Sequence, residues 1–130
     1  MVAIGAYLAA CVKSWPAIPE EEYSKKLVGR WQGTVGDEKE IMSININGRF
    51  VCLLHQRGFI ANMIFPGVTG TISGTWSIAG RTVTLLVDGV EHEHLKNRSA
   101  SSEIVSFNDR EIVLKSARGE VSPFHRINDG

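Results

Sequence analysis

The sequence has no excess of either charge, because 14 Lys and Arg residues balance 14 Asp and Glu residues. Proteins that bind nucleic acid need excess positive charge on one face. The composition therefore argues against a nucleic-acid partner. With 130 residues, the chain is also too short for two separate cores. We expect a single domain with an N-terminal extension.

Cysteine is scarce, and the sequence motifs of catalysis are missing. The only cysteines are Cys11 and Cys52, with no C-x-x-C pair of the metal-binding kind. Cys52 lies in a strand-like stretch, where a buried free thiol fits better than a disulfide to Cys11. Neither a G-x-S-x-G motif nor a phosphate-binding loop occurs. We therefore expect a non-enzymatic protein that needs no cofactor.

One histidine pair has the spacing of a metal half-site. His92 and His94 would point to the same side of an extended segment, which suits zinc or nickel. Such a site needs two more ligands, and the only candidates are His55 and His125. A solvated polar loop over residues 89–102 explains the pair better, so we predict no metal site.

The first residues contain an apolar run that is too short to span a bilayer. Residues 2–10 are almost wholly apolar, and the run ends in Leu8-Ala9-Ala10-Cys11. This ending resembles the lipobox of bacterial lipoproteins, in which a peptidase cleaves before the cysteine and the cysteine is acylated. The resemblance implies a lipid anchor on Cys11, with residues 1–11 as a signal segment. No Lys or Arg precedes the run, so we expect a start site further upstream. The alternative is a short helix or strand packed on the domain.

The next residues predict a tether and then a short helix. Pro16 and Pro19 favour extended backbone over residues 12–19. Pro19 then suits the first turn of a helix, with three acidic residues at its positive end. Lys25 and Lys26 suit its negative end, and Gly29 stops the helix after about two turns.

From residue 30 onward, apolar residues recur with the period of two that is typical of β-strands. We expect strands at 30–35, 42–46, 49–57, 71–78, 81–88, 103–107, 111–117 and 120–127. Asn47-Gly48 is a strong hairpin-turn signal between the second and third of these. The predicted fold class is all-β: an eight-stranded antiparallel up-and-down β-barrel over residues 20–128, with a short N-terminal helix. Closure removes the exposed edges of an open meander.

Three features together resemble a known family: Gly29-x-Trp31 after a short helix, the meander of strands, and Arg126 in the last strand. The sequence is similar to bacterial lipocalin-like (calycin) domains of the short lipoprotein kind. In that family the tryptophan of G-x-W packs at the closed end of the barrel, and an arginine from the last strand lies over its ring. The resemblance therefore implies structural roles for Gly29, Trp31 and Arg126, with the last two in contact.

The expected interior is either a pocket for an apolar ligand or a filled core. Bulky side chains in so short a barrel favour the filled core. In the pocket alternative, the ligand would contact Met42, Ile44, Phe50, Cys52, Leu54, Ile72, Trp76 and Leu85. Val83, Ile104, Ile112 and Leu114 are further inward positions.

The connection over residues 59–66 has unusually many large apolar residues. It runs from Phe59 to Pro66 and has three readings. It is a lid over the open mouth of the barrel, a surface for a protein partner, or a buried strand.

The sequence suggests two functions from different classes and a third alternative. The first is a lipid-anchored lipocalin-like barrel that binds a small apolar molecule in the bacterial cell envelope, facing the periplasm. Because Val12 is not aspartate, the resemblance implies the outer membrane. The second is a protein-binding module, such as a protease-inhibitor-like barrel that uses residues 12–19 as a plug. The third is a structural envelope lipoprotein.

Overall fold

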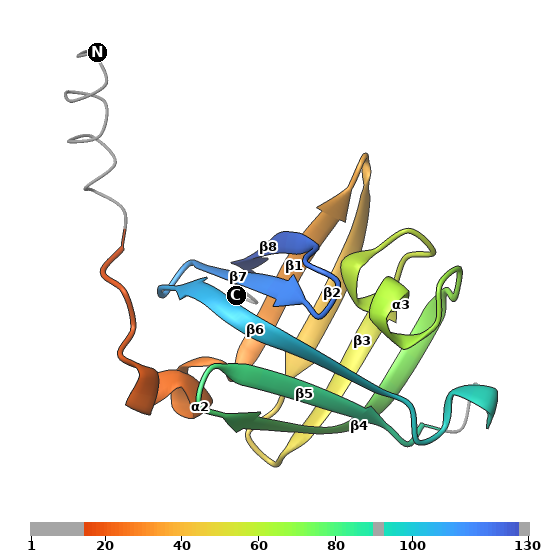
Figure 1. Ribbon diagram of the computed structural model, residues 1–130, viewed down its shortest axis with the longest axis horizontal. Coiled ribbons are helices and arrows are strands. Elements are labelled where there is room, and N and C mark those ends of the chain that lie inside the picture. Colours follow the sequence, from red (N-terminus) through yellow and green to blue (C-terminus); the bar gives the residue numbers. More distant parts are fainter. Residues whose placement is uncertain (1–14, 90–92, 128–130) are drawn as a thin grey trace.

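Eight antiparallel strands form one closed barrel (Figure 1). The computed structural model describes residues 15–89 and 93–127. The strands are β1 (Gly29–Val35), β2 (Glu38–Ile44), β3 (Arg49–Leu54), β4 (Gly70–Ala79), β5 (Thr82–Val87), β6 (Ser99–Phe107), β7 (Glu111–Ser116) and β8 (Val121–Arg126). Each strand pairs with the next, and β8 pairs with β1. The up-and-down barrel expected from the sequence is confirmed.

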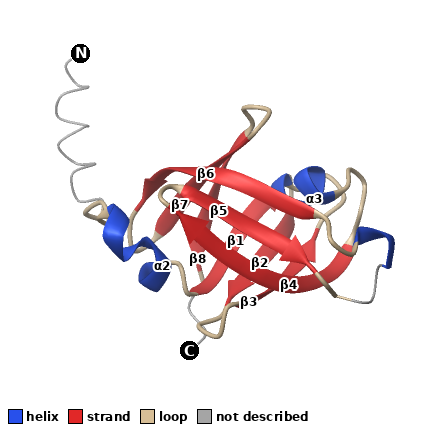
Figure 2. Ribbon diagram, turned by 60° about the horizontal axis from the view of Figure 1, so that its bottom comes forward, coloured by secondary structure: helices blue, strands red, loops and turns tan. Residues whose placement is uncertain are grey.

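Short helices lie at the two ends of the barrel (Figures 1 and 2). A 3-10 turn, η1 (Glu20–Glu22), and α2 (Tyr23–Lys26) precede β1 at one end, which we call the closed end. Between β3 and β4, α3 (Phe59–Ile64) lies at the other end, which we call the mouth, and η2 (Glu93–Leu95) connects β5 to β6. Within residues 15–89 and 93–127, no helix has the length and apolar character needed to cross a membrane.

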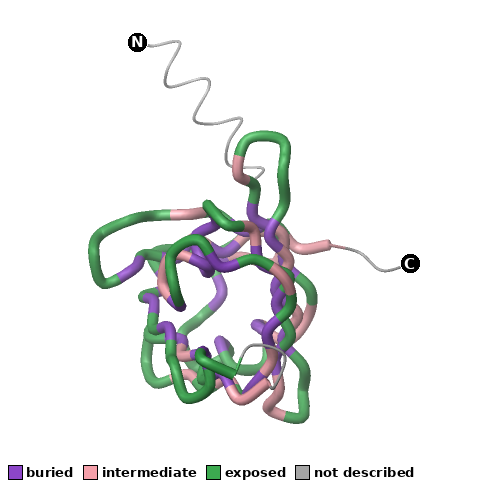
Figure 3. The backbone as a smooth tube through the Cα atoms, turned by 90° about the vertical axis from the view of Figure 1, so that its right-hand side faces the viewer, coloured by how far each residue is buried: buried purple, intermediate pink, exposed green. Residues whose placement is uncertain are grey.

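The interior is built by alternation along the strands, interrupted in β6 by a register shift between Ile104 and Ser106. Successive side chains of a strand point to opposite faces, so buried residues tend to recur at every second position. β3 shows the pattern clearly: Phe50, Cys52 and Leu54 are buried, whereas Val51 and Leu53 are exposed. Viewed along the barrel in Figure 3, the strands form a ring. The apolar core lies inside this ring.

Three strand boundaries differ from the predictions by three residues or more. β2 begins at Glu38 rather than at residue 42, and β3 ends at Leu54 rather than at residue 57. β6 begins at Ser99, inside the stretch that we expected to be a polar loop. The inward positions of that missed part are small residues, Ala100 and Ser102, which carry too little apolar signal to reveal a strand.

At the closed end, Trp31 and Arg126 are in contact, as the resemblance implied. The Arg126 guanidinium carbon lies 4.2 Å from the Trp31 ring centroid. The same guanidinium donates to the backbone carbonyls of Asp109 (2.8 Å), Val28 (3.1 Å) and Lys26 (2.7 Å). Burial lowers the pKa of Arg126 from its ordinary value, but an arginine keeps its charge at neutral pH. One side chain thus joins α2, the β6–β7 turn and the start of β1 to the last strand.

Gly29 is required at this place for two reasons. Its φ of +142° is a backbone conformation that side chains with a Cβ rarely adopt. A Cβ there would also lie 2.5 Å from the Arg126 guanidinium nitrogen. The indole nitrogen of Trp31 donates to the Leu27 carbonyl at 2.9 Å, so the fully buried Trp31 has its polar atom satisfied.

Part of the expected tether contacts the barrel. Ala17 forms an isolated β-bridge with Asn108, and the Ile18 N–H donates to the Phe107 carbonyl at 2.9 Å. The Ile18 side chain is buried. Cys11 and the lipobox lie outside the described residues.

Replacing Arg126 tests the joint at the closed end. We expect Arg126→Ala to lower the free energy of unfolding by about 3 kcal/mol, because three charge-assisted hydrogen bonds and a cation–π contact are lost. The measurement is urea denaturation followed by circular dichroism. The control is Arg118→Ala in the β7–β8 turn, where we expect a change within about 0.5 kcal/mol. Equal stability of the two variants would contradict this role of Arg126.

Candidate functional site

The mouth of the barrel is covered by α3, which lies over the interior. Its residues Phe59, Ile60, Ala61 and Ile64 are buried in the core cluster. The Phe59 ring meets Phe124 of β8 edge-on, with centroids 6.0 Å apart. The segment is a helix, so the reading of residues 59–66 as a buried strand is wrong. The sequence could not show this, because a six-residue apolar run has no clear period. The placement matches the lid reading. A protein partner for this segment stays a prediction.

A buried carboxylate holds α3 in place. Glu40 of β2 is 1% exposed, and its oxygens accept the N–H groups of Ile60 (2.8 Å) and Ala61 (3.1 Å). A longer contact of 3.4 Å joins it to the His55 N–H. The first N–H groups of a helix have no partner within the helix, and a negative charge there is favoured by the helix dipole. Glu40 thus satisfies groups that would otherwise be buried without partners.

The residue before α3 has to be glycine because Glu40 lies against it. A Cβ built on Gly58 would overlap the Glu40 carboxylate. Gly58 is also the N-cap residue of α3, with extended backbone and no side chain to cap the helix. The capping oxygens come instead from Glu40, which is close in space and distant in sequence.

Burial changes the acid–base chemistry of two interior groups. Desolvation raises the pKa of Glu40 above its ordinary value, and the hydrogen bonds from Ile60 and Ala61 oppose this rise without cancelling it. Burial also strongly raises the pKa of the Cys52 thiol, with a smaller contribution from the charge of Glu40. Cys52 is therefore a protonated, apolar wall residue rather than a nucleophile.

The far end of α3 is held by aromatic contacts at the protein surface. Phe65 follows the helix and meets the His94 ring edge-on at 5.5 Å. The Arg98 guanidinium lies 5.1 Å from the Phe65 ring centroid. Phe65 stays 39% exposed, so this fastening adds little apolar burial.

Cavities lie on both sides of α3. One of about 460 Å³ is bounded by Asn62, Met63 and Pro66, together with residues of β6 and of the β7–β8 turn. Another of about 410 Å³ is bounded by Phe59, Asn62 and Arg57, together with residues of β1 and β8. The helix is therefore packed on its inner face and open along its flanks.

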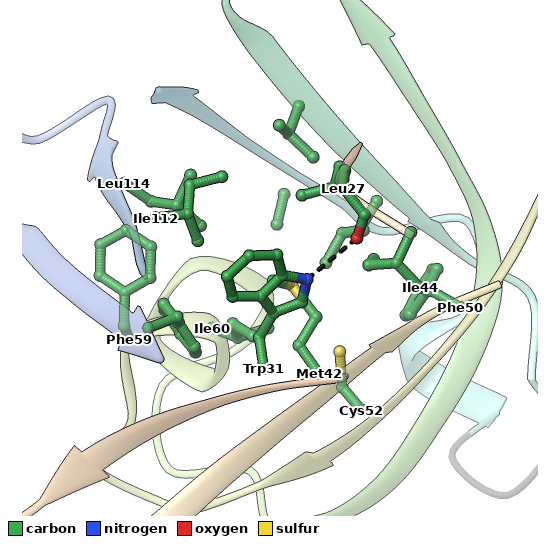
Figure 4. Close-up of a cluster of buried hydrophobic side chains, with 14 of the residues drawn as sticks. Leu27, Trp31, Met42, Ile44, Phe50, Cys52, Phe59, Ile60, Ile112 and Leu114 are labelled. Carbon is green, nitrogen blue, oxygen red and sulfur yellow. Dashed lines mark hydrogen bonds between the residues drawn. The ribbon is translucent and has the colours of Figure 1, made fainter. Parts of the chain in front are cut away.

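The eight residues predicted to contact a ligand all lie on the inner face of the barrel. Seven are buried, and Trp76 is partly buried, with its indole nitrogen donating to the Asn45 carbonyl at 2.8 Å. Figure 4 shows Met42, Phe50 and Cys52 in one cluster with Trp31 and with Ile60 from α3. None of the eight borders any of five cavities of about 320–490 Å³ found on the described residues. Their contact with a ligand stays a prediction.

The histidine pair gains no metal site from the structure. His92 lies outside the described residues, and His94 packs on Phe65. Among the residues that the structure describes, no three His, Cys, Asp or Glu side chains gather to hold a metal ion.

Glu40 is the residue of this site that sequence reasoning missed. It stands in the charged stretch Asp37-Glu38-Lys39-Glu40, which suggests a turn. One signal could have found it. Glu40 is two residues before Met42 and four before Ile44, so the two-residue period of a strand puts all three on the same face of β2.

Solved structures share this architecture. A lipocalin-like protein from Bacteroides uniformis superimposes with a TM-score of 0.52 and 13% sequence identity, over 78% of this chain and 99% of that one. The fold is lipocalin-like. An uncharacterized protein from Bacteroides eggerthii gives a TM-score of 0.50 and 11% identity, over 77% of this chain and 98% of that one. No protein-family model and no curated protein sequence matches the chain. At such low identity the likeness shows the fold of the lipocalin-like barrel alone.

The raised pKa of Glu40 predicts a pH dependence of stability. The folded barrel holds the Glu40 proton more tightly than the unfolded chain, where the ordinary value is 4.5. Stability from this group is therefore highest below that value and falls as pH rises through the raised pKa of the folded state.

Glu40→Gln does not titrate and keeps one acceptor oxygen, so it serves as the reference. We expect the free energy of unfolding of the wild type, minus that of Glu40→Gln, to decrease between about pH 4 and pH 8. Urea denaturation at each pH measures both. Histidines distant from Glu40 cancel in the difference, and His55, which interacts electrostatically with Glu40, is replaced by Gln in both proteins. A difference independent of pH would show that burial does not govern Glu40.

Proposed function

We propose that the chain is a non-enzymatic lipocalin-like barrel that takes up a small apolar molecule beneath α3. The observation that carries the proposal is that a six-residue helix, rather than a strand or turn, covers the mouth of the barrel and fills the space under it. The ligand takes the place of the inward side chains of α3 when the helix moves aside.

The way in which α3 is fastened supports movement as a unit. Glu40 binds its first turn, and Phe65 contacts His94 and Arg98 beyond its last turn. Between these points its flanks border cavities on both sides. A helix of this length is not stable alone in water, so its position depends on these contacts and on its buried face. Elements with few contacts open at lower free energy than the rest of a fold.

The space under α3 suits an apolar ligand. Its walls include Ile112 and Leu114 of β7 and Phe124 of β8, all of them buried. The only buried charged side chain among the described residues is Glu40. These walls offer few hydrogen-bond partners. An apolar molecule needs none, so it can be buried there without leaving a polar group unsatisfied.

The cell envelope is the place that we propose for this activity, through a lipid anchor on Cys11. Support comes from the sequence Leu8-Ala9-Ala10-Cys11 and from the position of Trp15, where the described chain begins, at the closed end. An anchor at Cys11 would leave the mouth facing away from the membrane.

The binding proposal predicts an effect for one surface substitution and none for a second. Phe65→Ala removes one fastening of α3 without altering the core, so we expect faster binding of the neutral probe N-phenylnaphthylamine, by about fivefold. Leu53→Ala, on the outer face of β3 and similarly exposed, should leave the rate unchanged. Stopped-flow fluorescence measures both rates.

A third variant addresses the space itself. Ile60→Ala shortens a fully buried side chain of α3. We expect it to increase the equilibrium affinity for the probe about tenfold, because the added room is apolar. Two results together would refute the proposal. The wild type and the three variants would all fail to bind the probe, and native mass spectrometry of protein from its own host would show the mass of the protein without a bound molecule.

A further inference from the structure

The closed end carries a second feature, which is independent of the interior and of α3. A surface cavity of about 490 Å³ lies among the end of α2, the β6–β7 turn and β8. Four cations and one carboxylate surround it: Lys25, Lys26, Arg110, Arg126 and Asp109. Trp15 and Val28 complete the wall. The sequence as a whole is neutral, so this concentration of positive charge is local.

Apart from Asp109, two acidic residues of the same end lie beside other cavities. Glu20 and Glu21 border other cavities, beside Tyr23 and the β4–β5 turn. The short helical segment therefore places Glu20 and Glu21 beside one set of cavities and the Lys25–Lys26 pair beside another. This separation leaves the cavity with a positive field, which attracts anions.

Several of these cations are available to a ligand. No described residue forms a hydrogen bond or ion pair with the Lys25 ammonium. The Arg110 guanidinium lies 5.4 Å from the Trp15 ring centroid. The Lys26–Asp109 ion pair, at 3.6 Å, joins side chains that are 38% and 47% exposed, and such pairs are weak. An anion with greater charge than a single carboxylate can displace Asp109 from Lys26.

The wall formed by Trp15 is held in place by the chain that follows it. Ala17 pairs with Asn108, and Ile18 donates to the Phe107 carbonyl. Trp15 itself is 50% exposed. An exposed indole beside cations offers an apolar surface next to a charged one.

We propose that this cavity binds a phosphate group, with Lys25, Lys26 and Arg110 as its ligands and Trp15 packing on the part of the molecule next to the phosphate. Arg126 contributes charge, since its N–H groups already donate to three carbonyls. A phosphate carries more charge and more acceptor oxygens than a carboxylate, and arginine matches its geometry. The phosphate belongs either to a soluble molecule or to a lipid headgroup.

The test uses the full chain and three probes: inorganic phosphate, glycerol phosphate, and vesicles of phosphatidylglycerol compared with vesicles of phosphatidylcholine. Calorimetry measures the soluble probes, and sedimentation measures the vesicles. The double variant Lys25→Gln/Arg110→Gln is compared with Arg57→Gln/Arg118→Gln, which removes equal charge at the mouth. Thermal unfolding confirms that both variants fold.

We expect the closed-end variant to weaken binding at least tenfold, since each charge-assisted hydrogen bond is worth about tenfold in affinity. The mouth variant should bind within about twofold of wild type. Loss of binding to the soluble probes assigns a free phosphate ligand. Loss seen only with phosphatidylglycerol vesicles, and reproduced by Trp15→Ala, assigns a headgroup. Equal weakening by both double variants, or no binding of any probe to the wild type, overturns the proposal. Neither result bears on the binding of N-phenylnaphthylamine beneath α3, so the two proposals can fail independently.

Discussion

The structure depends on the seam where the last strand returns to the first. β1 pairs with β2 along its whole length, but with β8 only at Trp31 with Arg126 and Gln32 with His125. The short seam gains its strength from Arg126, which bonds carbonyls on both sides of it and covers the Trp31 ring. With the seam closed, each of the eight described strands has a neighbour on both sides, and one face of every strand is enclosed. The core of the barrel follows from that enclosure.

Each end of the barrel is fixed by one charged side chain that bonds backbone groups. At the closed end Arg126 donates to carbonyls, and at the mouth Glu40 accepts N–H groups from α3. The two differ in solvation, because Arg126 is partly exposed while Glu40 is almost wholly buried. Burial of an ionised carboxylate is costly even when it is hydrogen-bonded. Burial disfavours the charged form at both ends, raising the pKa of Glu40 and lowering that of Arg126, but an arginine keeps its charge at neutral pH.

The sequence was sufficient for the barrel and for the contact of Trp31 with Arg126, because alternation and a glycine-tryptophan motif are local signals. The sequence was insufficient for short elements, for strand positions with small side chains, and for sites whose residues are distant from one another in the chain. α3 has six residues, too few to separate a helix from a strand by periodicity. Ala100 and Ser102 are too small to mark the start of β6. The cavity at the closed end unites Trp15, Lys25 and Arg110, which no spacing rule connects.

The packed interior sets a condition on any molecule that the barrel takes up. Displacing α3 exposes Phe59, Ile60 and Ile64, at a cost of roughly 1.5–3 kcal/mol for each side chain. Glu40 regains water at the same time, which offsets part of that cost. A ligand must then bury at least as much apolar surface as the helix gave up before any net affinity remains. A molecule with only a few carbon atoms cannot do this, so the small molecule that we propose must carry enough apolar surface to replace the buried face of the helix.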